Sequence, residues 1–240
     1  MKVSVTLKQK KHIYGIGLLI KLYVVRNLDL YGGNDMKLKD AIRTMLYKNK
    51  PVGYNQLITK WGRQLDPECV LPEYPRPQLR RSNYIILNGY WNYSITEGIN
   101  KPDSFDGKIL VPFSPESLLS GVNRQLMPGQ TLWYERDLII NTIPANMRCI
   151  LHFGAVDQSC KVFINNQEVG EHTGGYLPFS IDITEHIKYG TNILTLSVTD
   201  QSDRSYHSRG KQKLKRGGMF YTAQSGIWQT VWMEWVPQLY

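Results

Sequence analysis

The chain has 240 residues, of which 42% are hydrophobic and 20% charged, so its composition is that of a globular protein and excludes wholesale disorder. Its net charge of +9 would suit a nucleic-acid binder, but residues 1–80 hold fifteen Lys and Arg against six Asp and Glu, whereas residues 81–240 hold fourteen of each. The main body is therefore neutral, and we expect no nucleic-acid partner.

Residues 1–50 are expected to form an N-terminal extension that is partly helical or disordered. The apolar run at 13–25 is interrupted by Lys21 and is too short to span a bilayer, and no good signal-peptide cleavage site follows it. We predict no membrane partner and a cytoplasmic location, with a signal peptide as the alternative. Residues 35–48 are predicted to form a short helix, capped by Asp35.

The three cysteines, Cys69, Cys149 and Cys160, are odd in number and lack the spacing of a metal site. Cys149 and Cys160 lie in apolar, strand-like runs, where a free thiol usually packs as a small core residue. We therefore expect a reducing compartment, no metal and no cofactor.

Residues 51–86 contain the proline-spaced sequence DPECVLPEYPRPQLRR. Proline at this density favours an extended backbone and cannot join the interior of a sheet, because it lacks the N–H that a sheet requires. This segment is predicted to lie as a strap on the surface of the domain that follows.

From residue 87 onward the pattern changes to strands separated by turn-forming residues. The Asn165-Asn166 pair predicts a tight hairpin, because Asn tolerates the positive φ that such a turn requires. Many strands with almost no helix between them predict an all-β fold over residues 87–240, an antiparallel jelly-roll β-sandwich. The predicted strands lie at 87–95, 108–111, 131–140, 147–153, 160–164, 167–172, 176–183, 193–199 and 227–236.

Three of these strands show informative faces. The strand at 193–199 alternates strictly, which predicts one buried and one wetted face. Glu135 and Asp137 share one face of the strand at 131–140, which we interpret as solvated. The last strand, 227–236, is apolar on both faces, so we expect it to be covered on both sides or to await a partner surface.

Residues 153–184, FGAVDQSCKVFINNQEVGEHTGGYLPFSIDIT, resemble the signature of the N-terminal sugar-binding domain of glycoside hydrolase family 2. That family includes β-galactosidases and β-glucuronidases, and its domain is a galactose-binding-like jelly roll. Five further blocks resemble the family in the same order: LITKWGRQLDPECVLPEYPRP, LNGYWNY, WYER, VTDQSD and SGIW. Asn166 departs from the pattern, since the family commonly has glycine there. We interpret Gly174, Gly175 and Gly226 as residues that shape turns and perform no chemistry.

The resemblance implies that the parent protein hydrolyses β-glycosides with two carboxylates, which the family carries on a separate (β/α)₈ barrel. Only four residues follow Val236, and the Asn-Glu dipeptide that marks the family's acid/base residue is absent from the sequence. We therefore expect no catalytic residue and no activity in this chain alone. The expected partners are a β-glycoside carbohydrate and the catalytic barrel of the parent enzyme.

Candidate carbohydrate-binding residues follow the strand at 193–199. The resemblance matches Asp203 to an aspartate that hydrogen-bonds substrate hydroxyls, and Asp200, Tyr206 and His207 lie beside it. Carboxylates suit this role because each oxygen accepts hydrogen bonds from vicinal hydroxyls. The alternative for Asp203 is an Asx motif that stabilises a turn.

The basic stretch SRGKQKLKRGGMF, residues 208–220, is interpreted as a loop that shapes substrate access, with a solvated loop as the alternative. Deleting residues 211–216 is expected to change the kinetics of a full-length parent and leave the sandwich folded. The candidate access residues are Lys211, Lys213, Lys215 and Arg216.

Two other functions stay open. An independent carbohydrate-binding module would share the jelly-roll fold, so the fold cannot separate it from the first hypothesis. The strap and the last strand favour the first hypothesis, because both suit a neighbouring domain. An intact hydrolase would require this chain by itself to cleave a β-glycoside.

Overall fold

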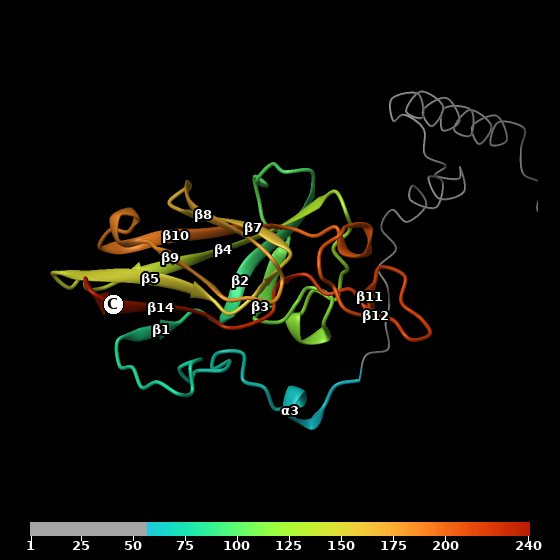
Figure 1. Ribbon diagram of the computed structural model, residues 1–240, viewed down its shortest axis with the longest axis horizontal. Coiled ribbons are helices and arrows are strands. Elements are labelled where there is room, and N and C mark those ends of the chain that lie inside the picture. Colours follow the sequence, from blue (N-terminus) through green and yellow to red (C-terminus); the bar gives the residue numbers. More distant parts are fainter. Residues whose placement is uncertain (1–56) are drawn as a thin grey trace, which may run out of the picture. The chain divides into compact units, whose positions relative to one another are not determined.

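A computed structural model describes residues 57–240, which lie within one compact unit, Pro51–Tyr240. The predicted helix at 35–48 and the apolar run at 13–25 lie outside the described residues. Two antiparallel sheets pack face to face around one hydrophobic core (Figure 1), which confirms the predicted β-sandwich. The first sheet has the order β1-β14-β5-β9, formed by Tyr84–Ile86, Val231–Pro237, Met147–Phe153 and Phe179–Asp182. The second has the order β3-β2-β4-β10-β7-β8, formed by Gly107–Val111, Gly89–Glu97, Gln130–Ile140, Gly190–Thr199, Ser159–Ile164 and Gln167–Thr173.

Two short strand pairs and four short helices complete the described part of the chain. Strand β6, Val156–Asp157, pairs with β13, Gly226–Ile227, and β11, Gln212–Lys213, pairs in parallel with β12, Tyr221–Thr222. The stretch that the sequence presented as a basic loop therefore contains a strand. The short helices are α3 Lys60–Arg63, η1 Leu118–Ser120, η2 Thr184–His186 and η3 Ser202–Arg204. In the described part of the chain, no helix is long and apolar enough to cross a membrane.

The alternation in β10 has the predicted effect on its inner face, where Leu194, Leu196 and Val198 are all fully buried. Its outer face is less exposed to solvent than predicted, because Thr195 is only 1% exposed. The Thr195 hydroxyl donates to the Glu135 carboxylate at 3.2 Å, and Lys101 pairs with the same carboxylate at 2.7 Å. Glu135 is therefore part of a local polar network and does not simply face solvent.

The hairpin between β7 and β8 has the predicted geometry. Asn165 and Asn166 both adopt positive φ, 52° and 67°, which is the backbone that a tight two-residue turn needs. The Asn165 amide also donates to the Asn192 side chain at 2.9 Å, so the turn is fixed to the neighbouring strand β10.

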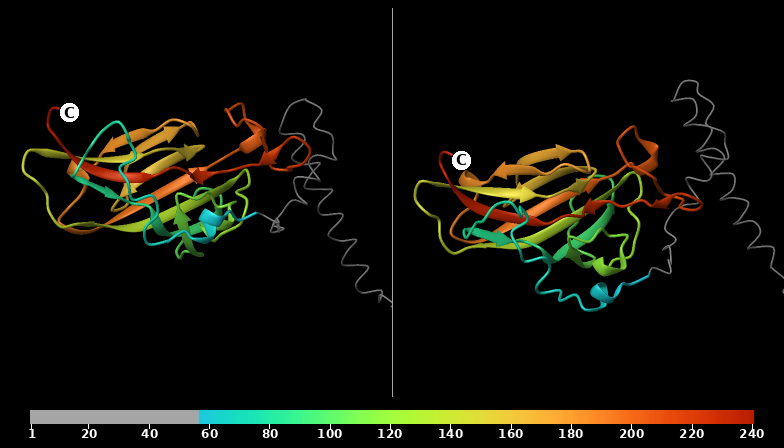
Figure 2. Two further views of the ribbon diagram at one scale, coloured as in Figure 1. Left: turned by 90° about the horizontal axis from the view of Figure 1, so that it is seen from below. Right: turned by 60° about the horizontal axis from the view of Figure 1, so that its bottom comes forward.

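From residue 57 on, the strap runs along the outer face of the β14 sheet before it ends in β1 at the sheet edge (Figure 2). The Tyr74 ring lies edge-on to Trp232 of β14, with ring centres 6.5 Å apart, and Trp232 is only 4% exposed. The last strand is thus covered on both sides, as predicted. Because the cover comes from this chain, its two apolar faces are no argument for a neighbouring domain.

Candidate functional site

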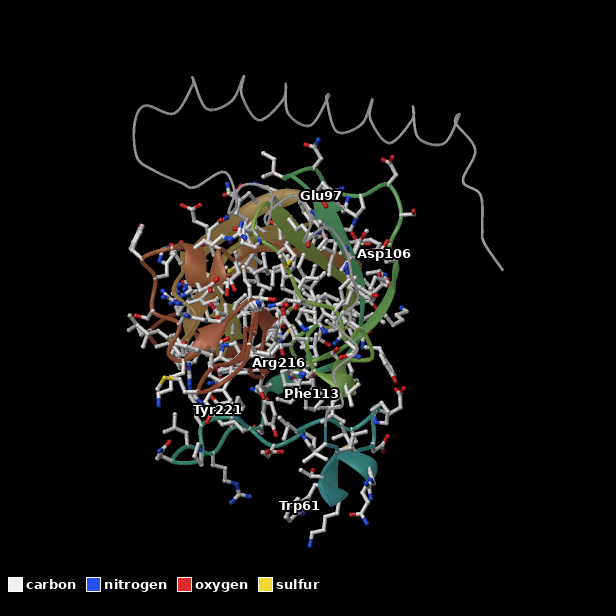
Figure 3. The ribbon with its side chains drawn as sticks, turned by 90° about the vertical axis from the view of Figure 1, so that its right-hand side faces the viewer. Trp61, Glu97, Asp106, Phe113, Arg216 and Tyr221 are labelled. Carbon is white, nitrogen blue, oxygen red and sulfur yellow. The ribbon has the colours of Figure 1, made fainter. Side chains whose placement is uncertain are left out.

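A cavity of about 400 Å³ opens at the end of the sandwich that carries β11 and β12. Figure 3 views this end, with Phe113, Arg216 and Tyr221 labelled. The cavity combines apolar and aromatic walls with neutral polar groups and one carboxyl group. Its lining residues are Pro112, Phe113, Ser114, Ser117, Asp157, Tyr176, Gln212, Gln224 and Trp228.

Strand β6 positions the single carboxyl group of the cavity. Asp157 lies opposite Gly226 in the β6–β13 pair, and its side chain packs against the backbone of Gly175. A side chain at position 175 would overlap the Asp157 carboxyl, so only glycine allows this approach. The Gly-Gly turn therefore does more than reverse the chain, because it makes room for Asp157.

Tyr176 and Trp228 form the aromatic wall. Their ring centres lie 6.2 Å apart in an edge-on arrangement, and the Trp228 indole N–H donates to the Gly175 carbonyl at 2.7 Å. Trp228 remains 37% exposed and Tyr176 44% exposed, so both rings are accessible at the cavity. Partly exposed aromatic rings of this kind suit a ligand with an apolar face and polar edges.

The opposite wall is held by neutral hydrogen bonds. The Ser114 hydroxyl donates to the side-chain oxygen of Gln224, and the Gln224 backbone N–H donates to the side chain of Gln212. These bonds join the segment after β3 to the segments around β11 and β12. The amide and hydroxyl groups of this wall can each donate and accept hydrogen bonds.

Beneath this wall lies a buried carboxylate, Glu116. It accepts hydrogen bonds from the Leu126 and Ser225 backbone N–H groups, both at 3.1 Å, and from the Ser225 hydroxyl at 2.7 Å. Burial raises the pKa of Glu116 to about 8, although these hydrogen bonds act in the opposite direction. Glu116 thereby connects the Ser114–Ser117 side of the cavity to the residues next to Gln224.

Two neighbouring carboxyl groups at the cavity, Asp157 and Asp200, have raised pKa values. Burial, together with the charge of Asp200, raises the pKa of Asp157 to about 7. Burial likewise raises the pKa of Asp200. Within residues 57–240, no three His, Cys, Asp or Glu side chains gather as metal ligands, so nothing there resembles a metal centre.

The predicted binding residues lie around this site and do not line it. Asp200 is 7% exposed and accepts a hydrogen bond from the Ser202 N–H at 2.6 Å. The Asx contact proposed for Asp203 is therefore made by Asp200. Asp203 and His207 are half-buried and their charges act on Asp200, whereas Tyr206 is 94% exposed and its ring packs at a tilt against His207, with ring centres 4.5 Å apart.

The predicted access residues also lie outside the cavity lining. Lys213 lies over the Phe220 ring at 3.8 Å, and Arg216 donates to the Thr222 hydroxyl at 3.0 Å. Lys211 and Lys215 are exposed. From this stretch, the residue that lines the cavity is the neutral Gln212.

Sequence reasoning missed Asp157, Tyr176 and Trp228, although all three stand inside the motifs that carry the family resemblance. In those two motifs the roles assigned from the sequence are structural, such as those of the turn-forming Gly174, Gly175 and Gly226. Two signals in the sequence indicate a site. Asp157 directly follows a short apolar run, and the aromatic residues Tyr176 and Trp228 follow glycine turns.

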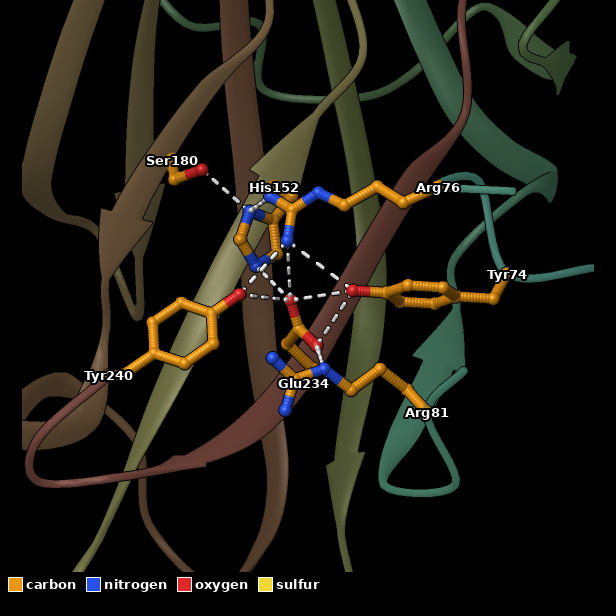
Figure 4. Close-up of polar contacts among 7 residues, drawn as sticks. All are labelled: Tyr74, Arg76, Arg81, His152, Ser180, Glu234 and Tyr240. Atoms are coloured by element: carbon orange, nitrogen blue, oxygen red, sulfur yellow. Dashed lines mark hydrogen bonds and ion pairs between the residues drawn. The ribbon is translucent and has the colours of Figure 1, made fainter. Parts of the chain in front are cut away.

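A second polar cluster lies on the outer face of the β14 sheet, around the buried His152 and Glu234 (Figure 4). His152 Nδ1 is 2.6 Å from the Ser180 hydroxyl, and His152 Nε2 is 2.9 Å from Glu234. These contacts are similar to those of a hydrolytic triad. The cluster comprises Tyr74, Arg76, Arg81, His152, Ser180, Glu234 and Tyr240.

The charges in this cluster favour a structural role. Glu234 pairs with Arg76 at 3.2 Å and with Arg81 at 3.7 Å, so two guanidinium groups already neutralise the carboxylate. Burial lowers the pKa of His152 to about 4, and Arg76 Nη2 lies 3.4 Å from the nitrogen that faces Ser180. A general base needs a free lone pair and a pKa nearer to neutral. The cluster therefore serves to hold the strap on the sheet.

Comparison with known proteins agrees with this architecture. The family model described as "Glycosyl hydrolases family 2, sugar binding domain" matches residues 119–237. The chain carries the sugar-binding domain of glycoside hydrolase family 2. The resemblance predicted from the sequence is thus confirmed, and the folded domain extends beyond the matched residues, since β2 and β3 belong to the same sheet as β4.

Named relatives are much longer than this chain. A putative β-glucuronidase of Formosa agariphila is 32% identical over 165 residues, which cover 69% of this chain and 17% of the relative. A β-galactosidase of Thermoanaerobacter pseudethanolicus is 32% identical over 104 residues, 42% of this chain and 13% of the relative. A solved β-glucuronidase from an uncultured Clostridium sp. shares the fold with a TM-score of 0.53 at 23% identity, over 67% of this chain and 30% of that one.

Proposed function

We propose that this domain binds the glycosyl unit of a β-glycoside in the cavity at Asp157 and presents it to a catalytic domain. The observation that carries the proposal is the lining itself, in which two accessible aromatic rings face neutral amides and hydroxyls around one carboxyl group. Sugar rings have apolar faces that stack on aromatic rings and hydroxyl edges that pair with such polar groups. Ligand sites combine apolar walls with a few polar groups in this way.

The hydrolytic step belongs to the longer protein in this proposal. The chain spans 17% and 13% of the lengths of the two relatives described above, and those relatives are named for cleavage of glucuronides and galactosides. Retaining glycosidases of this kind need two carboxyl groups about 5–5.5 Å apart. We infer that a separate barrel supplies them and that this chain alone cleaves no glycoside.

The residues after β10 have a supporting role in this proposal. The charge of Asp200 acts on Asp157, the charges of His207 and Asp203 act on Asp200, and Asp203 is half-exposed. From there Asp203 extends the binding surface toward a longer substrate. The exposed Lys211, Lys215 and Arg216 border the access to this end of the domain.

A reducing, cytoplasmic location suits the thiols. Cys69, Cys149 and Cys160 are all free, and burial raises the pKa of both Cys149 and Cys160 to about 12. Such thiols are inert core residues, which agrees with a compartment where disulfides are rare.

An independent carbohydrate-binding module remains the second candidate. The observation that favours it is that this chain by itself forms a cavity of about 400 Å³ with two accessible aromatic rings. A module that acts alone needs a dissociation constant in the micromolar range, whereas a domain that shares its substrate with a barrel can bind with millimolar affinity.

The test is a titration of the 240-residue chain with methyl β-glycosides, followed through the indole N–H signals in nuclear magnetic resonance spectra. We expect the Trp228 signal to shift and the signal of the buried Trp91 to stay unchanged. A chromogenic β-glycoside should show no turnover. Absence of any Trp228 shift at about 50 mM ligand, well above a millimolar dissociation constant, would contradict glycoside binding.

A further inference from the structure

We propose that the cavity at Asp157 selects an uncharged glycosyl unit and rejects a uronic acid. This inference rests on the proposed function and deepens it, because it states which sugars the cavity accepts. It concerns a single chemical difference, a hydroxymethyl group or a carboxylate at C6 of the sugar.

The lining supplies no counter-charge for a carboxylate ligand. In the described part of the chain, none of the residues that line the cavity is Lys or Arg, and Asp157 is the lining residue that becomes anionic near neutral pH. The remaining polar groups are the hydroxyls of Ser114, Ser117 and Tyr176 and the amides of Gln212 and Gln224. These groups match hydroxyls well, because both sides donate and accept.

A second carboxyl group strengthens the effect. Asp200 lies close enough to Asp157 for its charge to raise the pKa of Asp157, and both residues are buried. Like charges repel strongly where the dielectric constant is low. A uronate carboxylate in this cavity would be a third negative charge at the same place.

The nearby basic residues do not compensate. Lys213 lies over the Phe220 ring and Arg216 is bonded to Thr222, and neither residue lines the cavity. His207 acts on Asp200, but it does not line the cavity. Recognition of a carboxylate normally uses an Arg or Lys at hydrogen-bond distance, and this site has none among its described lining residues.

This inference separates the chain from several of its relatives. The putative β-glucuronidase of Formosa agariphila is named for a substrate that carries a carboxylate, whereas the Thermoanaerobacter enzyme is named for a neutral galactoside. The charge of the cavity places this domain with the neutral-sugar group.

The experiment compares methyl β-D-glucopyranoside with methyl β-D-glucuronide, which differ only at C6. The chain is titrated with each at about pH 8, where Asp157, with a pKa of about 7, is ionised, and the Trp228 indole signal is followed. Asp200 and Tyr176 are the other titratable groups that face Asp157. We expect the glucuronide to bind at least about tenfold more weakly, which corresponds to about 1.4 kcal/mol.

Two variants test the cause. Asp157→Asn should reduce the difference between the ligands to less than about threefold, since it removes the nearest charge. Asp137→Asn, the same charge change at an exposed site on β4, should leave the difference unchanged. Two outcomes would overturn the inference and leave the proposed function intact. In one, the unmodified chain binds the glucuronide equally or more tightly. In the other, the Asp157→Asn variant keeps the tenfold difference. Failure of both ligands to bind overturns the proposed function and this inference with it.

Discussion

The indole N–H of Trp228 donates a hydrogen bond of 2.7 Å to the backbone carbonyl of Gly175. Gly175 is in turn the residue whose missing side chain makes room for Asp157. The ring of Trp228 and the carboxyl group of Asp157 thus both pack on Gly175, although Trp228 lies 53 residues from it.

Replacing Trp228 by Ala is expected to weaken glycoside binding at least tenfold, or about 1.4 kcal/mol, because the stacking surface is lost. The fold should persist, since the ring is 37% exposed. Trp61→Ala is the matched control, because Trp61 is 70% exposed and lies outside the cavity lining. Binding is measured by titration calorimetry, and equal affinities in both variants would exclude Trp228 from the site.

Gly226→Ala is expected to destabilise the domain by more than about 2 kcal/mol. Gly226 has a φ of 73°, and an added Cβ would overlap the hydroxyl of the buried Tyr134. Gly98→Ala has nearly the same φ, 77°, but its Cβ would meet open space, so it should cost only about 1 kcal/mol. Urea denaturation compares the two, and similar losses would mean that φ alone determines the effect.

Glu234→Gln is expected to destabilise the domain by about 3 kcal/mol, because Arg76 and Arg81 keep their charges beside a buried neutral amide. The strap should loosen, and trypsin should then cut faster at the exposed Arg80. The control is Glu168→Gln, which breaks a surface pair with Lys161 and should leave the stability nearly unchanged. Unchanged cleavage at Arg80 would show that the strap is held by other contacts.

The free energy of unfolding is expected to fall as pH rises from about 6.5 to about 8. Burial raises the pKa of Asp157 to about 7 and of Glu116 to about 8, so the folded chain keeps protons that the unfolded chain releases near pH 4. Since the folded state binds more protons in this window, a higher pH favours unfolding. Burial lowers the pKa of His152 to about 4, so it acts in the opposite direction, but only below about pH 6.5.

Urea denaturation at the two pH values measures this slope. Glu116→Gln and Asp157→Asn should each flatten it, whatever they cost at pH 6.5, because each removes a titrating group. Glu168→Gln should keep the slope of the unmodified chain. A stability that rises over this window in the unmodified chain would mean that neither carboxyl group is protonated in the folded state.

Much of the fold could be predicted from local sequence. The run at 147–153 coincides with β5, and Asn165-Asn166 adopts the predicted turn, because strand alternation and turn chemistry involve residues that are neighbours along the chain. The family motifs likewise lie within short segments, so their order was enough to indicate the domain. The short strand β11 escaped prediction, because its two residues are held by a parallel partner nine residues further along the chain.

The site required the tertiary structure. In the sequence, Asp157 and Asp203 are both acids that follow strand-like runs, and only the packing of Gly175, Trp228 and Asp200 around Asp157 distinguishes them. In the sequence, Glu234 is a charged residue within an apolar strand. Only the structure shows its partner Arg76, which lies 158 residues away along the chain. The physical reason is the distance along the chain between the residues involved. Backbone periodicity and turn preference depend on adjacent residues. Burial, charge repulsion and the shape of a cavity depend on residues that folding brings together from distant parts of the chain.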